Sequence, residues 1–191
     1  SAILRLAENN IYSKKKEEPI MKTTPAYVFF YGTKDIYSNF HPVDFIHQGQ
    51  RFFCSEQAVM YRKAKLFGAD KIAEQIVKAK TPNEAKSLGR SKQIAFNEEV
   101  WIANREQVYY EVLVDKFSVP KLKDALLRTG KRTLVEASPS DTIWGIGLAE
   151  SNPLIQYPAQ WKGLNLLGKT LMRVRDTLNL PQVDSAKKAT V

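Results

Sequence analysis

CSEQAVMYRKAK, residues 54–65, predicts a helix that carries an acid and a base on one side. Ser55 offers an N-cap hydroxyl, and Glu56 in the first turn suits the positive end of the helix dipole. Lys63 follows Glu56 by seven residues, so at 3.6 residues per turn it returns to nearly the same side, about 10 Å along the axis. We expect this helix to run to about Phe67 and the two charged side chains to face inward.

Further helices and strands are indicated on both sides of this segment. Apolar residues recur at helical spacing in some stretches, with proline near the start or glycine at the end, and other stretches are rich in β-branched and aromatic residues. We therefore expect helices at 70–80, 82–90, 98–117, 120–130 and 164–178, and strands at 26–32, at 43–53 (two short strands) and at 132–138. Helices outnumber strands without βαβ regularity, so the predicted fold class is α+β: a helix-rich single domain with a few short strands.

Length and charge set further limits. A chain of 191 residues suits one domain, which we place at 25–179, between a flexible leader at 1–24 and a flexible tail at 180–191. The formal net charge of +9 falls mostly in the predicted domain. Such a charge suits a polyanionic partner or a phosphate-bearing ligand, although surplus surface lysine can also serve solubility alone.

Cysteine and histidine are too few for several classes of protein. Cys54 is the only cysteine, which excludes a disulfide framework within the chain and a cysteine-rich zinc site. The two histidines, His41 and His47, lack the spacing of a helical metal pair. We expect no metal and no cofactor. No run approaches the roughly 18 apolar residues of a membrane span, and we expect a cytoplasmic protein without membrane contact, or a nuclear one in a eukaryote.

Two loops combine polar and aromatic residues. In YGTKDIYSNFHP, residues 31–42, Asn39 is surrounded by aromatic side chains that include Tyr31 and Phe40. In SPSDTIWGIGLAES, residues 138–151, glycines lie beside a tryptophan, which would let the backbone approach a ligand while the indole offers a stacking face. A turn around a buried tryptophan explains the same pattern, so both interpretations stay open. The candidate ligand-binding residues of the second loop are Asp141, Trp144, Gly145 and Gly147.

Several motifs, taken in order, resemble the NADAR (NAD- and ADP-ribose-associated, YbiA-like) family. The motifs are YSNF, SEQAVMYRKAKLF, LGR, DKF, LLRTG, DTIWGIG and WKGLNLLGKTLMRVR, and they extend over about residues 27–178. The resemblance implies a YbiA-like α+β fold and N-glycosidase activity. It implies two substrate classes: ADP-ribose attached to the guanine base of nucleic acid, and phosphoribosylamino-pyrimidine intermediates of riboflavin synthesis.

The resemblance also implies roles for individual residues. The family's motif glutamate and the lysine seven residues later correspond to Glu56 and Lys63. The remaining family positions correspond to the aromatic residues Trp101 and Trp144, to Asp141 and to Asn165. Two departures are evident: Gln57 replaces a histidine that often follows the motif glutamate, and the segment 148–162 is longer than in short bacterial members. The longer segment is similar to a fungal and viral branch, which weakens the riboflavin assignment.

Cleavage of a ribosyl C–N bond requires stabilisation of positive charge at C1 and a better leaving group. We expect the helix dipole to lower the pKa of Glu56, so that its carboxylate acts as an anion or base rather than a general acid. Lys63, beside apolar neighbours, could form a Schiff base with the ring-opened C1, or simply contact a phosphate or hydroxyl. We expect Arg90 to bind phosphate, Trp144 and Trp101 to stack, and Asn39 and Asn165 to bind ribose hydroxyls, with Asp141 as the alternative catalytic carboxylate.

These inferences lead to an expected function. The chain is expected to be a hydrolase of the N-glycosidase class that removes ADP-ribose from guanine bases, with an ADP-ribose-containing or phosphoribosyl ligand and ADP-ribosylated DNA or RNA as candidate partners. The alternatives are an N-glycosidase of riboflavin intermediates, a non-catalytic ADP-ribose-binding module and a basic nucleic-acid-binding domain. An acid–lysine pair is unnecessary for either non-catalytic alternative, which favours the enzyme.

Overall fold

The computed structural model describes residues 22–181. The predicted leader up to residue 21 and the predicted tail from residue 182 lie outside the described residues. The last residues of that leader are part of the domain, since Thr23 forms a β-bridge with Val28 and Thr24 accepts a hydrogen bond from the backbone N–H of Tyr27.

The predicted α+β class is confirmed by the order of the elements. The helices are α1 (Ser55–Leu66), α2 (Asp70–Lys78), α3 (Pro82–Leu88), α4 (Glu98–Phe117), α5 (Pro120–Arg128) and α6 (Leu166–Leu178). The strands are β1 (Tyr27–Phe30), β2 (Phe45–His47), β3 (Gln50–Phe52) and β4 (Thr133–Glu136). Two 3₁₀ helices, η1 (Pro153–Gln156) and η2 (Pro158–Gln160), were not predicted, and both lie in the long segment 148–162. None of the helices between residues 22 and 181 has the length and apolar character needed to cross a membrane.

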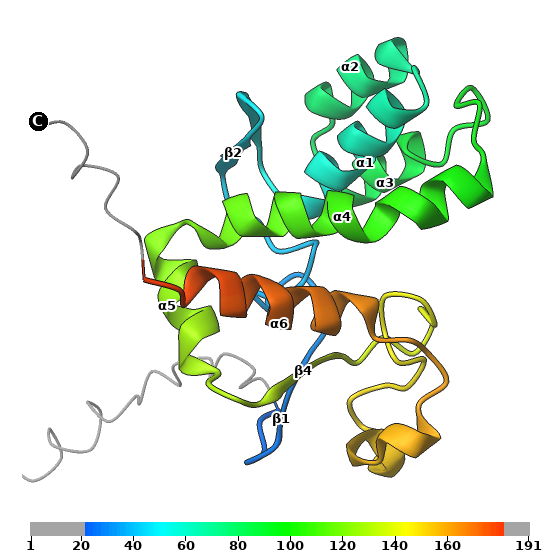
Figure 1. Cartoon of the computed structure of the whole chain (residues 1–191). Coiled ribbons are helices and arrows are strands. Elements are labelled where there is room, and N and C mark those ends of the chain that lie inside the picture. Colours follow the sequence, from blue (N-terminus) through cyan, green and yellow to red (C-terminus); the bar gives the residue numbers. More distant parts are fainter. Residues whose placement is uncertain (1–21, 182–191) are drawn as a thin grey trace, which may run out of the picture.

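Helix α4 is the centre of the layered arrangement (Figure 1). Helices α1–α3 lie on one side of α4, and α6 lies on the other side with the β1–β4 sheet beyond it. The predicted apolar stripe of α4 explains this position, because Val112 and Leu113 are wholly buried between the two layers. The β2–β3 hairpin packs against the same helix.

The sheet formed by β1 and β4 is parallel, a feature that the sequence analysis did not predict. Strand β1 pairs with β4 in a register that sets Phe30 opposite Glu136. The carboxyl ends of both strands therefore lie at the same edge, and the loops 31–42 and 137–147 leave from that edge. In open α/β sheets, this is the edge at which ligands bind.

The start of α1 differs from the prediction. Cys54, not Ser55, is the N-cap residue, and no side chain caps the helix. The Ser55 hydroxyl instead donates to Asn39 Oδ1 at 3.1 Å, and the backbone N–H of Glu56 donates to the Asn39 carbonyl at 2.9 Å. A loop carbonyl thus satisfies an N–H that the first turn of the helix leaves unpaired, and this contact fixes the loop 31–42 against α1.

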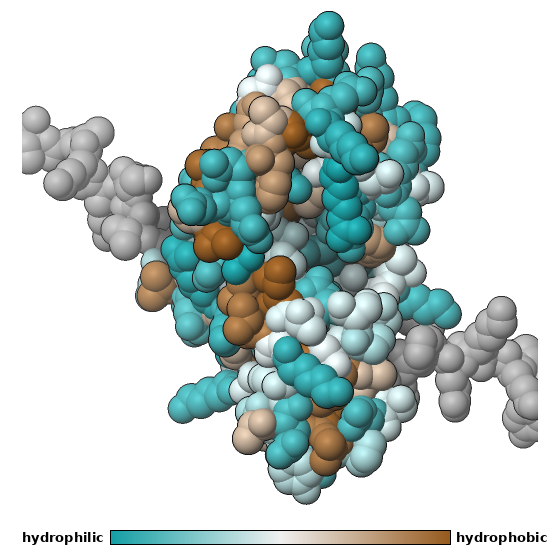
Figure 2. Space-filling model, turned by 90° about the vertical axis from the view of Figure 1, so that its right-hand side faces the viewer, coloured by the Kyte–Doolittle hydropathy of each residue, from teal (hydrophilic) through white to brown (hydrophobic). Residues whose placement is uncertain are grey.

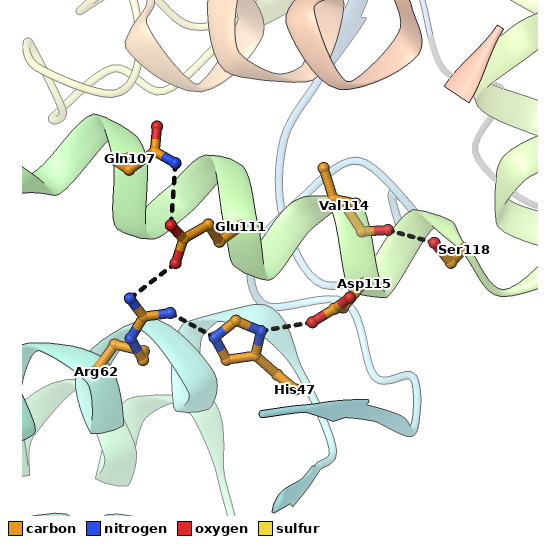
Figure 3. Close-up of polar contacts among 7 residues, drawn as sticks. All are labelled: His47, Arg62, Gln107, Glu111, Val114, Asp115 and Ser118. Carbon is orange, nitrogen blue, oxygen red and sulfur yellow. Dashed lines mark hydrogen bonds and ion pairs between the residues drawn. The ribbon is translucent and has the colours of Figure 1, made fainter. Parts of the chain in front are cut away.

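A polar network joins the hairpin, α1 and α4 (Figure 3). His47 contacts Asp115 through Nδ1 at 2.6 Å and Arg62 through Nε2 at 2.7 Å. Because a guanidinium can only donate, Nε2 accepts from Arg62, and Nδ1–H donates to Asp115. Arg62 also pairs with Glu111 at 2.8 Å. The only buried histidine of the described chain therefore has a structural explanation.

Gly168→Ala tests how closely α6 and β4 approach. A Cβ at Gly168 would lie 2.0 Å from the Leu134 carbonyl oxygen and 2.6 Å from the Asn165 amide. Backbone atoms cannot yield as a flexible side chain can, so we expect the free energy of unfolding to fall by about 3 kcal/mol or more. Urea denaturation measures this change, with Lys169→Ala on the exposed face of α6 as the control. A Gly168→Ala variant within about 0.5 kcal/mol of the parent would contradict this packing.

Candidate active site

Two adjoining cavities open at the carboxyl edge of the β1–β4 sheet. The inner cavity has a volume of about 160 Å³ and the outer one about 620 Å³. They share Ser38, Phe40, Lys86, Arg90, Glu136 and Asp141. Figure 2 views the molecule from the side on which the start of α4 and the 138–164 loops lie. It shows a recess between the upper and the lower part of the molecule.

Most of the predicted site residues meet in these cavities. The inner cavity is lined by Asn39, Phe40, Glu56, Lys63, Arg90, Trp101, Asp141 and Trp144, and Tyr31 lines the outer one. Segments far apart in the sequence thus converge on one site. Gly145, Gly147 and Asn165 line neither cavity.

Glu56 is almost wholly buried, with 4% of its surface exposed. Burial raises its pKa to about 7, and the positive charges of Lys86 and Arg90 offset only part of that increase. The expectation that the helix dipole lowers this pKa is therefore wrong, because loss of hydration outweighs the dipole. A carboxyl group that titrates near neutral pH can both take and give a proton under ordinary conditions.

Lys63 is held away from Glu56. Its Nζ donates to the Gly89 carbonyl at 2.9 Å and lies 4.6 Å from the centre of the Phe96 ring and 5.5 Å from that of Trp101. Partial burial and, next, the charge of Arg90 lower its pKa, as the sequence suggested for a sheltered lysine. A lowered pKa increases the fraction of neutral, nucleophilic amine.

Trp144 has one face of its indole already covered. The Tyr109 ring stacks on it with centroids 3.5 Å apart and an interplanar angle of 15°. Since Tyr109 is buried on α4, the indole is fixed in orientation. A planar ligand in the inner cavity can therefore stack only on the remaining face or against an edge of the indole.

Asp141 orders the loop that carries Trp144. Its Oδ1 accepts hydrogen bonds from the backbone N–H groups of Ile143 at 2.8 Å and Trp144 at 2.7 Å. This is an Asx-type turn, in which the aspartate side chain fixes the residues that follow it. Asp141 thus lines both cavities and also holds the tryptophan loop in place.

The predicted ligand contacts of Gly145, Gly147 and Asn165 do not fit their positions. Asn165 is 1% exposed and uses both ends of its amide on β4: Nδ2 donates to the Leu134 carbonyl, and Oδ1 accepts from the Glu136 N–H. The two glycines allow close packing within the protein. A Cβ on Gly145 would lie 2.9 Å from Ser138 Cβ, and one on Gly147 would lie 3.0 Å from Lys162 Cβ.

The sequence analysis missed four residues of chemical interest that line the inner cavity. Lys86 lies 5.2 Å from the centre of the Phe40 ring and faces both cavities. Lys86 lies on α3 four residues before Arg90, which follows the end of that helix, and this proximity in sequence was a usable signal. Glu136 ends a buried strand, a recognised place for ligand-binding residues, but its exposure could not be judged from the sequence. The other two are Ser38 and Tyr109.

Lys116 supports the cavity from behind. It is wholly buried and donates from Nζ to the Ser38 carbonyl at 2.8 Å. Burial lowers its pKa to about 7. This contact holds the loop 31–42 from the α4 side, while Ser55 holds it from the α1 side. Among residues 22–181, no group of three or more His, Cys, Asp or Glu side chains is arranged to hold a metal ion.

Comparison with known proteins identifies the family. The pattern of the NADAR domain matches residues 29–179, most of the chain. The chain belongs to the NADAR family. The NMR structure of Escherichia coli YbiA has the same fold, with a TM-score of 0.67, 28% identity, and coverage of 84% of this chain and 89% of YbiA. The expectation of a YbiA-like fold is thereby confirmed.

Two relatives of this NADAR protein bear on its activity. N-glycosidase R617 of Acanthamoeba polyphaga mimivirus is 38% identical over 165 residues, which cover 80% of this chain and 96% of R617. The riboflavin biosynthesis protein PYRR of Zea mays is 34% identical over 166 residues, which cover 79% of this chain but only 25% of PYRR. The relatives named N-glycosidases confirm the expectation of an enzyme, a hydrolase of the N-glycosidase class.

Arg90→Gln tests the electrostatics of this cavity. The charge of Arg90 lowers the pKa values of both Glu56 and Lys63. Its removal should therefore raise both values, although one group is an acid and the other a base. Titration of carbon-13-labelled side chains by NMR measures the two shifts. The exposed Lys92→Gln variant loses the same charge outside the cavity and should leave both unchanged; an equal effect of the two substitutions would contradict a local influence of Arg90.

Proposed function

We propose that this NADAR enzyme hydrolyses the bond between ADP-ribose and a guanine base of nucleic acid or of a nucleotide. The observation that carries the proposal is a small cavity, lined by Glu56 and Lys63, that adjoins a wider cavity. Glu56 and Lys63 line only the inner cavity, whereas Lys86 and Arg90 border both. An N-glycosidic bond held in the inner cavity would thus meet an acid and an amine together.

Cavity size supports an ADP-ribose ligand. The inner volume of about 160 Å³ suits a ribose ring. The outer volume of about 620 Å³ lies within the range of pockets that hold drug-sized ligands. Beside the two basic residues it offers the hydroxyl groups of Ser138, Ser140 and Thr142. A diphosphate and a second nucleoside fit this lining, because arginine and lysine bind phosphate and hydroxyl groups bind phosphate or sugar oxygens.

The charge of Glu56 suits the cleavage step. As the C1–N bond breaks, positive charge develops on C1 and the ring oxygen. An ionised Glu56 stabilises that charge, or takes a proton from the attacking water or from the ribose 2′-hydroxyl. With a pKa of about 7, the ionised fraction increases as the pH rises through neutrality.

Lys63 offers a covalent route. Its neutral amine attacks C1, a bond from Nζ to C1 forms, and the bond from C1 to the base breaks, with a proton accompanying the departing base. Opening of the ribose ring then gives a protonated imine between Nζ and C1. Water adds to C1, the bond from C1 to Nζ breaks, and the sugar leaves with a hydroxyl group on C1 while the lysine amine is restored. The hydrogen bond from Nζ to the Gly89 carbonyl uses an N–H of the amine, so the lone pair of the neutral form remains free to attack.

A second candidate substrate is a phosphoribosylamino-pyrimidine. The similarity to the maize riboflavin biosynthesis protein favours it, although only a quarter of that protein is covered. Such a molecule carries one phosphate and no second nucleoside, so it fills less of the outer cavity. A non-catalytic ADP-ribose-binding module remains the outcome if binding is found without turnover.

Incubation with a guanine-ADP-ribosylated oligonucleotide and, separately, with a ribosylamino-pyrimidine phosphate tests the function. We expect release of ADP-ribose from the first, detected by mass spectrometry. Glu56→Gln should slow release about 100-fold or more, because it keeps the shape of the side chain but deletes the charge. ADP-ribose should raise the melting temperature of both proteins, which controls for binding. Cleavage of the pyrimidine substrate alone would favour the riboflavin activity.

Borohydride added during turnover tests the covalent route. If Lys63 forms an imine, reduction should leave ADP-ribose attached to the protein, and peptide mapping should place it on Lys63. Lys63→Arg keeps the charge, but guanidinium remains protonated and cannot attack, so no adduct should form. Full activity of Lys63→Arg would eliminate the covalent route. If Lys63→Arg is inactive and the parent protein gives no adduct, Lys63 has an electrostatic role instead.

A further inference from the structure

Glu136 is a second, partly buried carboxyl group that lines the inner cavity, and its backbone is held firmly. It ends β4, where its N–H donates to Asn165 Oδ1 at 3.1 Å and its carbonyl accepts from the Ile146 N–H at 3.1 Å. The β1 residue Phe30 lies opposite it in the sheet. The backbone of Glu136 is therefore fixed by three separate parts of the fold.

One oxygen of Glu136 has no hydrogen-bond partner. Among residues 22–181, only Glu136 Oε2 and Arg105 Nε are buried side-chain polar atoms without one. A buried carboxylate oxygen without a donor destabilises the folded protein, so such an atom calls for an explanation. Glu136 lines both cavities, and protonation of its carboxyl group would remove the cost of leaving a charged oxygen without a donor.

The size of the inner cavity brings Glu136 within reach of the reacting atoms. Its volume of about 160 Å³ is small beside the 620 Å³ of the outer cavity. A ribose ring seated there lies close to every lining side chain. Glu56 and Glu136 both line this space, so both would lie near C1 and the atoms bonded to it.

The groups that face Glu136 favour its protonated form. Asp141 in the adjoining loop and Glu56 on α1 are negatively charged and oppose ionisation of Glu136. Lys86 on α3 favours ionisation, but its effect is the smallest. Tyr109 faces Glu136 from α4. The charge of Asp141 also opposes ionisation of Glu56, but Lys86, Arg90 and Lys63 all favour its ionised form. When two carboxyl groups share a cavity, the one with more positive neighbours ionises first.

We propose that Glu136 is the general acid of this site, which gives its proton to the departing base as the C1–N bond breaks. The inference rests on the N-glycosidase function proposed above. The electron pair of the C1–N bond moves to the base nitrogen, which takes the Glu136 proton. C1 gains a bond from Lys63 Nζ or from water, and Glu136 regains a proton from the nucleophile or from solvent. Glu56 stabilises the positive charge or serves as the base.

The titration of Glu136 agrees with this division of roles. Burial raises its pKa to about 8, above the value of about 7 for Glu56. Between these values, one carboxyl group still carries a proton while the other is largely ionised.

Glu136→Gln separates acid catalysis from ligand binding. Glutamine keeps the shape and donates a hydrogen bond but cannot release a proton. We expect turnover of guanine-ADP-ribosylated oligonucleotide to fall about 10²- to 10⁴-fold. An ADP-ribose derivative with 4-nitrophenolate at C1 has a leaving group that needs no proton, so its turnover should stay within a few-fold of the parent. The exposed Glu106→Gln variant is the matched control.

Two results would overturn the proposal. Equal losses on both substrates would show that Glu136 binds the sugar, and parental rates on both would show that it takes no part. The alkaline side of the pH–rate profile adds a third measurement: activity of the parent should decline above about pH 8 as Glu136 loses its proton. That decline should be absent from the residual activity of Glu136→Gln.

Thermal unfolding tests the protonated state of Glu136 without any substrate. Its pKa is about 8 in the folded protein and near the ordinary 4.5 in the unfolded chain. The folded state thus binds more protons between these values, and the contribution of Glu136 to stability falls as pH rises from 4.5 to 8. Glutamine does not titrate, so Glu136→Gln should gain melting temperature over the parent between pH 5 and pH 9, by about 3 °C or more.

The substrate and stability measurements test the N-glycosidase function and the protonated state of Glu136 separately. If the parent cleaves neither the oligonucleotide nor the pyrimidine, the proposed function fails, whereas a pH-dependent gain in melting temperature would still support a protonated Glu136. If the parent is active and Glu136→Gln shows no such gain, the acid role is overturned and the N-glycosidase function stands.

Discussion

The start of helix α6 depends on hydrogen bonds to the tryptophan loop, and much of the active site depends on that contact. The backbone N–H groups of residues 164–167 donate to the carbonyls of residues 142–145. A helix leaves its first N–H groups without partners inside the helix, so these bonds satisfy groups that burial would otherwise leave unpaired. Asn165, in a left-handed conformation with φ 53°, adds the hydrogen bonds of its side chain to β4. One junction thus fixes Trp144, Glu136 and α6 together.

The cavity that this junction encloses is unfavourable for stability. Glu56, Glu136 and the wholly buried Lys116 all have pKa values displaced by burial toward their neutral forms. Each displacement means that the folded protein opposes a charge that water would accept. Proteins tolerate such groups where function requires them, and the remaining packing must offset the loss. The two hydrophobic clusters around α4 and behind the sheet provide that packing.

Local patterns predicted the elements well, and tertiary contacts explain what the sequence analysis missed. The predicted helix from Ser55 to about Phe67 is α1, which ends at Leu66, because its signals lie within the helix itself. The helix dipole is likewise a local effect, but the pKa of Glu56 is set by burial, which depends on distant segments. Asn165 was expected to bind ribose because it lies in a family motif. In the structure its side chain instead joins the start of α6 to β4. The place of Glu136 at the cavity could not be predicted, because it depends on the parallel pairing of β1 and β4.

The parallel pairing of β1 and β4 also has a consequence for the order of folding. Its partner residues, such as Phe30 and Glu136, are separated by about a hundred residues of chain. Helices form from neighbouring residues in microseconds or less, whereas contacts of such long range must first overcome the entropy of closing a large loop. Helices α1–α5 all lie within that loop. A nascent chain that has made its helices therefore still lacks the cavity, and the enzyme acquires its acid groups in one place only when the last strand docks.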